Sequence, residues 1–130
     1  MKNNKLFLLF ISLCLFISFS FKSYNVEENC SILHNGTFKY GDSRFTGVIK
    51  IKKNKHTEHH NNGKYVIKSD LEWVNECEYN ATITKVTVPN FPYKVGDKMN
   101  VKIIKVVGNQ VYTLSTVEDK NWEGLLVKIK

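Results

Sequence analysis

The sequence predicts an all-β fold, a small antiparallel meander that closes into an up-and-down barrel, with a β-sandwich as the alternative. From residue 37 onward, apolar and polar residues alternate with a period of two, and no window sustains a helical period. Turn-forming pairs such as Asn62-Gly63 and Gly108-Asn109 separate the alternating runs. A meander of about eight sequential strands must protect its edges, and closing a barrel or stacking two sheets does so.

The alternating runs locate the individual strands and assign their faces. In the longest one, Ile67, Ser69 and Leu71 share a predicted inner face, and Tyr79 and Ala81 do so in the next. Pro89 and Pro92 bracket the one clear break in the pattern, where no central strand is expected. The runs cover residues 37–40, 48–52, 65–73, 77–84, 99–107, 111–116 and 125–129.

The N-terminal segment has the order of a secretory signal peptide. A basic start, Met1 to Lys5, is followed by an uncharged apolar run, and Ser18-Phe19-Ser20 places small residues at alternate positions before a cleavage point. The apolar run is shorter than a membrane-spanning helix requires. We therefore predict a signal peptide over residues 1–20, a flexible lead-in over 21–29 and one β domain over 30–130. The expected location is secreted, periplasmic or envelope-associated, with membrane contact only through the signal.

Cysteine usage fits export. Of the three cysteines, Cys14 lies in the predicted signal, which leaves Cys30 and Cys77 in the mature chain. An even count in an oxidising compartment favours a disulfide between them, with two buried free thiols as the alternative.

The charge pattern argues against nucleic-acid binding. The chain carries a formal net charge of +7, but Arg44 is its single arginine and the lysines are spread along the strands. Nucleic-acid binders instead concentrate arginines with aromatic residues in one patch. We expect a solvated lysine face that also discourages edge pairing, with weak attraction to an anionic envelope surface as the alternative. The lysines at alternate, outward-facing positions are Lys50, Lys52, Lys68, Lys102 and Lys128.

A polar cluster at residues 56–60 is the sharpest candidate for chemistry. On an extended strand His56, Glu58 and His60 project to one face, and two imidazoles with a carboxylate are a ligand set for zinc or another first-row metal. The cluster also runs directly into Asn61-Asn62-Gly63, where a solvated hairpin end would be polar in any case. Both interpretations remain open from the sequence, and the solvated hairpin is the simpler one.

Aromatic residues provide a second, weaker candidate site. An eight-stranded barrel is either filled by side chains or holds one small ligand, and Tyr and Trp combine apolar surface with a polar group. An ordinary core is the competing interpretation. The candidate ligand-lining residues are Phe38, Tyr65, Trp73, Tyr79, Tyr112 and Trp122, within a wider aromatic set that includes Tyr40 and Phe91.

No pattern predicts an enzyme or a cofactor. Glu76 and Glu78 lie on one strand without an opposed carboxylate, and no base accompanies Cys77. Phosphate-binding loops, dinucleotide fingerprints and nucleophile elbows are absent from the sequence.

Short motifs resemble a family of small exported bacterial proteins. The quoted features are Cys30 before Gly36-Thr37-Phe38, the run from Ile67 to Tyr79 with its Trp73-x-x-x-Cys77-Glu78-Tyr79 turn, and Lys94-Val95-Gly96-Asp97 downstream. The resemblance implies a lipocalin-like barrel without an established function. Some members carry the label DNA topoisomerase IV, which this sequence does not support because it has no room for an ATPase module.

Together these patterns predict an exported, non-enzymatic binding module. Its expected partner is a small apolar or amphipathic ligand or an envelope component. The first alternative is a structural or interaction protein of the envelope with a filled core, and the second is metal binding through the His-rich hairpin.

Overall fold

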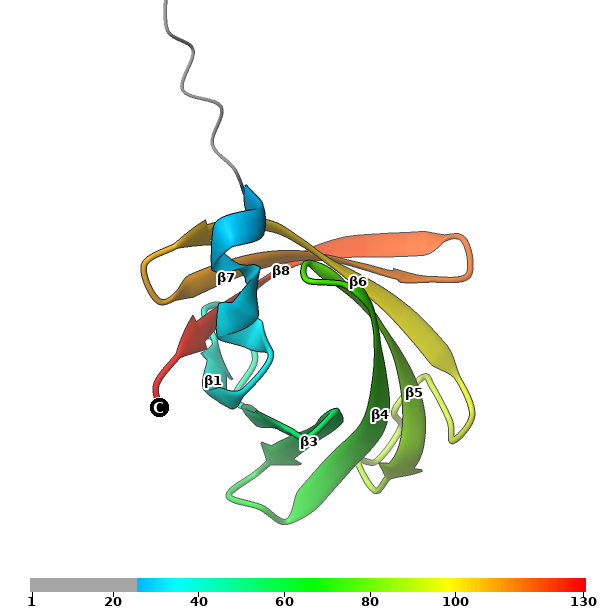
Figure 1. Ribbon diagram of the computed structural model, residues 1–130. Coiled ribbons are helices and arrows are strands. Elements are labelled where there is room, and N and C mark those ends of the chain that lie inside the picture. The colour runs from blue at the N-terminus through cyan, green and yellow to red at the C-terminus, as the bar shows by residue number, and fades with distance from the viewer. Residues whose placement is uncertain (1–25) are drawn as a thin grey trace, which may run out of the picture.

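A computed structural model describes residues 26–130 as a short helix followed by a closed barrel of eight antiparallel strands in sequence order (Figure 1). Each strand pairs with its sequence neighbours, and β1 pairs with β8 to close the barrel. The predicted all-β, closed antiparallel meander is therefore confirmed. The elements are η1 (Val26–Leu33), β1 (Gly36–Tyr40), β2 (Val48–Lys52), β3 (Lys55–His60), β4 (Tyr65–Asn75), β5 (Glu78–Val86), β6 (Lys98–Val107), β7 (Gln110–Val117) and β8 (Lys120–Lys128).

The period-two pattern sets which side chains enter the barrel. Ile67, Ser69 and Leu71 of β4 are buried, as are Tyr79 and Ala81 of β5. These are the faces that alternation predicts, because successive side chains of a strand point to opposite sides of the sheet.

One predicted outward lysine is an exception. Lys50, Lys52, Lys68 and Lys102 are exposed, but Lys128 shares the inner face of β8 with the buried Leu126. Its ammonium donates a 2.9 Å hydrogen bond to the Asn35 carbonyl oxygen just after η1. The prediction of an outward-facing Lys128 is wrong, because the strand ends where the carbonyl oxygens of Ile32 and Asn35 accept hydrogen bonds from its ammonium.

Residues 55–60 differ most from the sequence-based expectation. They form β3, a full strand paired with β2 on one side and with β4 on the other. The turn that follows contains Asn61, Asn62 and Gly63 with positive φ, the conformation that Asn-Gly favours. The polar residues before this turn therefore belong to a strand of the barrel and are not part of a solvated hairpin end.

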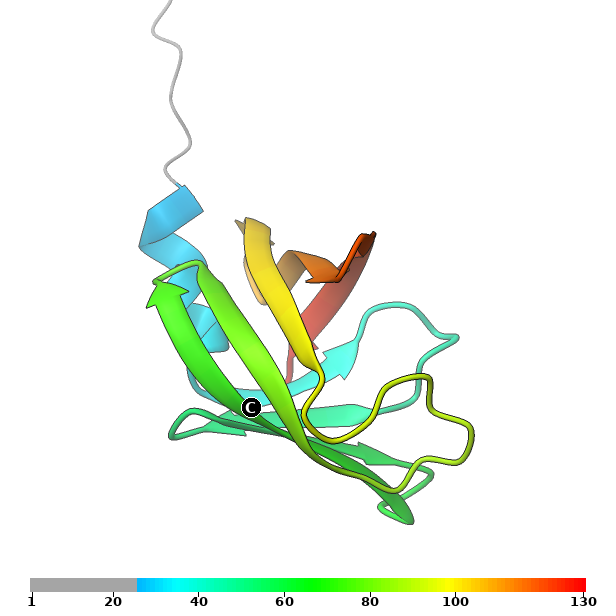
Figure 2. The same ribbon diagram turned by 90° about the vertical axis from the view of Figure 1, so that its right-hand side faces the viewer.

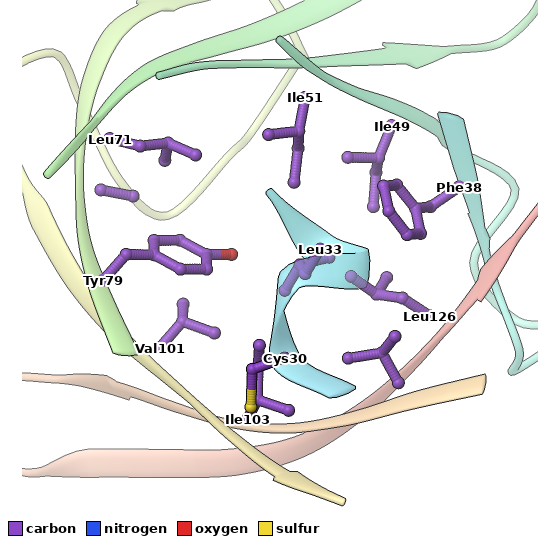
Figure 3. Close-up of a cluster of buried hydrophobic side chains, with 12 residues drawn as sticks. Cys30, Leu33, Phe38, Ile49, Ile51, Leu71, Tyr79, Val101, Ile103 and Leu126 are labelled. Atoms are coloured by element: carbon purple, nitrogen blue, oxygen red, sulfur yellow. The ribbon is translucent and has the colours of Figure 1, made fainter. Parts of the chain in front are cut away.

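The helix η1 packs against one end of the barrel. Cys30 and Leu33 are both 0% exposed, and Figure 3 shows Leu33 among the side chains of the strands around it. Cys30 is bonded to Cys77 in the β4–β5 turn, with Cα atoms 5.1 Å apart, so the predicted disulfide is confirmed. Residues 26–29, expected in a flexible lead-in, belong to η1, because the helix is held by this disulfide and by buried Leu33. The predicted signal peptide lies outside the described residues.

The two ends of the barrel are different. η1 lies on one side, and the loops at residues 41–47 and 87–97 lie on the opposite side (Figure 2). The predicted proline-bracketed break is the second of these loops. Among residues 26–130, no helix has the length and apolar character needed to cross a membrane.

Candidate functional site

The barrel encloses a cavity of about 470 Å³ that extends to the end opposite η1. Apolar side chains make up most of its wall, including Ile49 of β2, Ile67 of β4 and Val101 of β6. A pocket of this volume with a few polar groups is typical of small-molecule sites.

Three side chains of β3 place a charged cluster on this wall. The Glu58 carboxylate lies between two imidazoles, with Oε1 2.9 Å from His56 Nε2 and Oε2 2.9 Å from His60 Nε2. Their order along β3 follows the two-residue spacing of one strand face. The Tyr40 side chain, from the end of β1, also interacts with the carboxylate. We call these four residues the Glu58 cluster.

The environment of the cluster favours an ionised Glu58. The carboxylate side chain is only 13% exposed, and this burial acts to raise its pKa. Hydrogen bonds from His56 and His60 outweigh that effect and hold the pKa of Glu58 below its usual range. The bond to Glu58 in turn raises the pKa of His60, which favours the imidazolium form.

Two tyrosines beside Glu58 stay protonated. Burial, followed by the negative charge of Glu58, raises the pKa of Tyr40. The same two causes raise the pKa of Tyr79, which projects from β5 into the interior (Figure 3). The cavity therefore presents neutral phenol groups close to the ionised carboxylate of Glu58.

Aromatic side chains surround the far end of the cavity. Phe45 comes from the β1–β2 loop, Phe91 and Tyr93 from the β5–β6 loop, and Trp122 from β8. Tyr93 stacks on Trp122 with centroids 6.5 Å apart, while Phe45 and Trp122 are 56% and 40% exposed. We call these four residues the aromatic rim.

The structure separates the aromatic candidates into two groups. Tyr79 and Trp122 line the cavity, whereas Phe38, Tyr65, Trp73 and Tyr112 do not. Phe38 is fully buried in the apolar core, and Trp73 stacks on His34, with ring centroids 3.6 Å apart.

Tyr65 lies beneath the Lys64 ammonium, and Tyr112 hydrogen-bonds Gln110 beside β6. Sequence reasoning named Tyr40 only in the wider aromatic set and not among the candidate ligand-lining residues, although it alternates with Phe38 on the inner face of β1. Alternation along β1 could therefore have shown that Tyr40 lines the cavity. Its contact with Glu58 depends instead on pairing across strands.

The three predicted metal ligands lie together, but as a hydrogen-bonded triad. Each imidazole uses its Nε2 to bond Glu58, so these nitrogens do not converge with the carboxylate on a common point. In the part of the chain from residue 26 onward, no group of three or more His, Cys, Asp or Glu side chains has a metal-binding arrangement. Metal binding by His56, Glu58 and His60 stays a prediction that this geometry does not favour.

Comparisons with protein-family models, with curated proteins and with solved structures found no match for this chain.

Proposed function

We propose that this protein is an exported, non-enzymatic module that binds a small amphipathic ligand inside its barrel. The observation that carries the proposal is the cavity of about 470 Å³, with mainly apolar walls and one polar cluster. Apolar walls would bind the greater part of such a ligand, and a few polar groups would orient it.

The disulfide supports the location part of this proposal. Disulfides persist in oxidising compartments and are rare in the cytosol. The Cys30–Cys77 bond is consistent with a location outside the cytoplasm, in agreement with the signal-like residues 1–20.

The main alternative is a structural protein of the envelope that works through its surface. Such a protein gains stability from a filled barrel, because each void gives up packing contacts. The hollow interior therefore favours ligand binding over this alternative.

Filling the cavity tests the proposal directly. Ala81 of β5 is 4% exposed and lines the cavity, so Ala81→Phe would occupy the ligand volume. The matched control is Thr82→Phe, because the neighbouring residue points to the outer face. We expect the apolar fluorophore N-phenyl-1-naphthylamine to bind the wild type and Thr82→Phe, and to lose at least tenfold in affinity for Ala81→Phe.

Two further measurements serve as controls for this experiment. Circular dichroism establishes that Ala81→Phe is folded, and Ala81→Leu provides a smaller blocking side chain if it is not. Equal fluorophore affinity in the wild type and both blocking variants would contradict binding in the barrel. Native mass spectrometry of protein purified from its own host would detect a retained ligand and the mass of the processed chain.

A further inference from the structure

We propose that the ligand has a neutral hydroxyl head, which binds Tyr79 deep in the barrel, and an apolar chain that extends toward the aromatic rim. This inference rests on the proposed binding function and specifies the ligand class. It is carried by an unpartnered phenol on the cavity wall, the carboxylate of Glu58 on the same cavity and the direction of β5.

The Tyr79 hydroxyl faces the cavity and has no hydrogen-bond partner among the described residues. The residue is 2% exposed and lines the cavity, and Figure 3 shows its hydroxyl directed to the interior. Within residues 26–130 this hydroxyl makes no hydrogen bond, whereas the Tyr112 hydroxyl on the outer surface bonds Gln110. Tyrosine hydroxyl groups in protein interiors usually find a hydrogen-bond partner. A ligand oxygen in the cavity would supply that partner.

A second unpartnered atom lies in the same wall. His56 Nδ1 is buried and has no hydrogen-bond partner among the described residues, while its Nε2 faces Glu58. The cavity wall therefore offers a ligand two polar atoms without protein partners, this nitrogen and the Tyr79 hydroxyl.

The charges around Tyr79 disfavour an anionic head. Glu58 already contributes to the raised pKa of Tyr79, so a ligand carboxylate there would meet the same negative potential. Lys98, the one lysine among the cavity-lining residues, is exposed near the far end, at the start of β6, and Asp97 precedes it. A quaternary ammonium head is disfavoured for another reason, because it has no atom that accepts a hydrogen bond from Tyr79.

The course of β5 gives the ligand its direction. Tyr79 lies one residue into β5, next to the turn that holds Cys77, whereas Ala81 and Ile83 follow on the same face toward the open end. Beyond them stand Phe91 and Trp122 of the aromatic rim. A polar head at Tyr79 thus leaves an apolar chain to extend past Ala81 and Ile83 on the β5 side of the cavity, toward the aromatic rim.

A series of ligands with one chain and different heads tests the inference. Decanol, decanoate, decyltrimethylammonium and decyl chloride would compete with N-phenyl-1-naphthylamine at pH 7.5. We expect decanol to bind most tightly, about fivefold or more ahead of decyl chloride, the gain that one net hydrogen bond provides. Decanoate and decyltrimethylammonium should be weaker than decanol.

Tyr79→Phe assigns the preference to one oxygen atom. It should reduce decanol affinity about fivefold and leave decyl chloride affinity unchanged, so that the difference between the two ligands disappears. Tyr112→Phe is the matched control, because its hydroxyl bonds Gln110 on the outer side of β7. It should alter neither affinity.

The outcomes separate this inference from the proposed function. If neither the fluorophore nor any decyl compound binds, the binding function itself is contradicted. If they bind but decanoate or decyltrimethylammonium is preferred, or Tyr79→Phe keeps the preference for decanol, the barrel binds amphiphiles and the hydroxyl-head inference is overturned.

Discussion

The disulfide provides the clearest stability prediction, because it attaches η1 to the barrel. Cys30 and Cys77 are 47 residues apart in the chain. In the chain-entropy model a bond closing a loop of this length stabilises the folded state by about 4 kcal/mol. Small domains have only about 5–15 kcal/mol in total, so the Cys30→Ser/Cys77→Ser variant should lose a large part of its stability. Replacing both cysteines avoids a reactive free thiol.

Urea unfolding of the wild type and the variant measures this loss. The midpoint should fall strongly for the variant, and adding a reductant to the wild type should reproduce most of the shift. Hydrogen exchange should accelerate most in η1, where Cys30 and Leu33 are fully buried, because the helix loses its covalent attachment. A stability loss below about 1 kcal/mol, with η1 amides still fully protected, would refute the reasoning that the bond constrains the unfolded chain.

Three further predictions concern packing and the Glu58 cluster. Leu33→Ala should cost about 2–5 kcal/mol in urea unfolding, whereas Val74→Ala, at a residue that is 57% exposed, should cost less than about 0.5 kcal/mol. Glu58→Gln should flatten the pH dependence of stability. Because the pKa of Glu58 is lowered on folding, this residue stabilises the folded state at pH values above its ordinary pKa of 4.5. That stabilisation is lost as the pH falls through the folded-state pKa. Because the pKa of His60 is raised on folding, its stabilisation of the folded state is complete below pH 6.5 and is lost as the pH rises through the folded-state pKa. Urea midpoints with the same pH dependence in the wild type and Glu58→Gln would contradict both of these expectations. Gly47→Ala would place a Cβ 2.7 Å from His60 Cε1, so the His60 ring should move away from Glu58. The pKa of His60, followed by NMR, should then return toward 6.5. An unchanged His60 titration would contradict this prediction, because the ring would then accommodate the methyl group.

The architecture was predictable because its main cause is local. Alternation at Ile67, Ser69 and Leu71 reports directly which side of a strand is buried, and all three are inside the barrel. The Asn62-Gly63 turn is likewise a property of neighbouring residues. The disulfide was predictable from the cysteine count together with the expected compartment.

The site was only partly predictable because it depends on pairing across strands. The sequence places His56, Glu58 and His60 on one face, but it does not say that this face is the interior. That follows from the register, in which Glu58 is paired with Ile49 of β2 and Ile67 of β4. Tyr40 reaches Glu58 from a strand that is not adjacent to β3, and no local pattern encodes such a contact. The closeness of the cluster to the Asn-Gly turn made a solvated end the simpler interpretation.

The cost of the Glu58 cluster supports a binding role for the barrel. A buried carboxylate with imidazole partners is weak evidence for stability, since apolar residues of similar volume often serve a core at least as well. The neighbours of Glu58 in the register, Ile49 and Ile67, are apolar, so a filled core at this level would be completed by another apolar residue. The chain instead carries a charged group there, surrounds it with Tyr40, His56 and His60, and leaves a cavity in front of the group. A polar cluster that the fold does not require, facing a volume that side chains do not fill, is the arrangement expected if both serve a ligand.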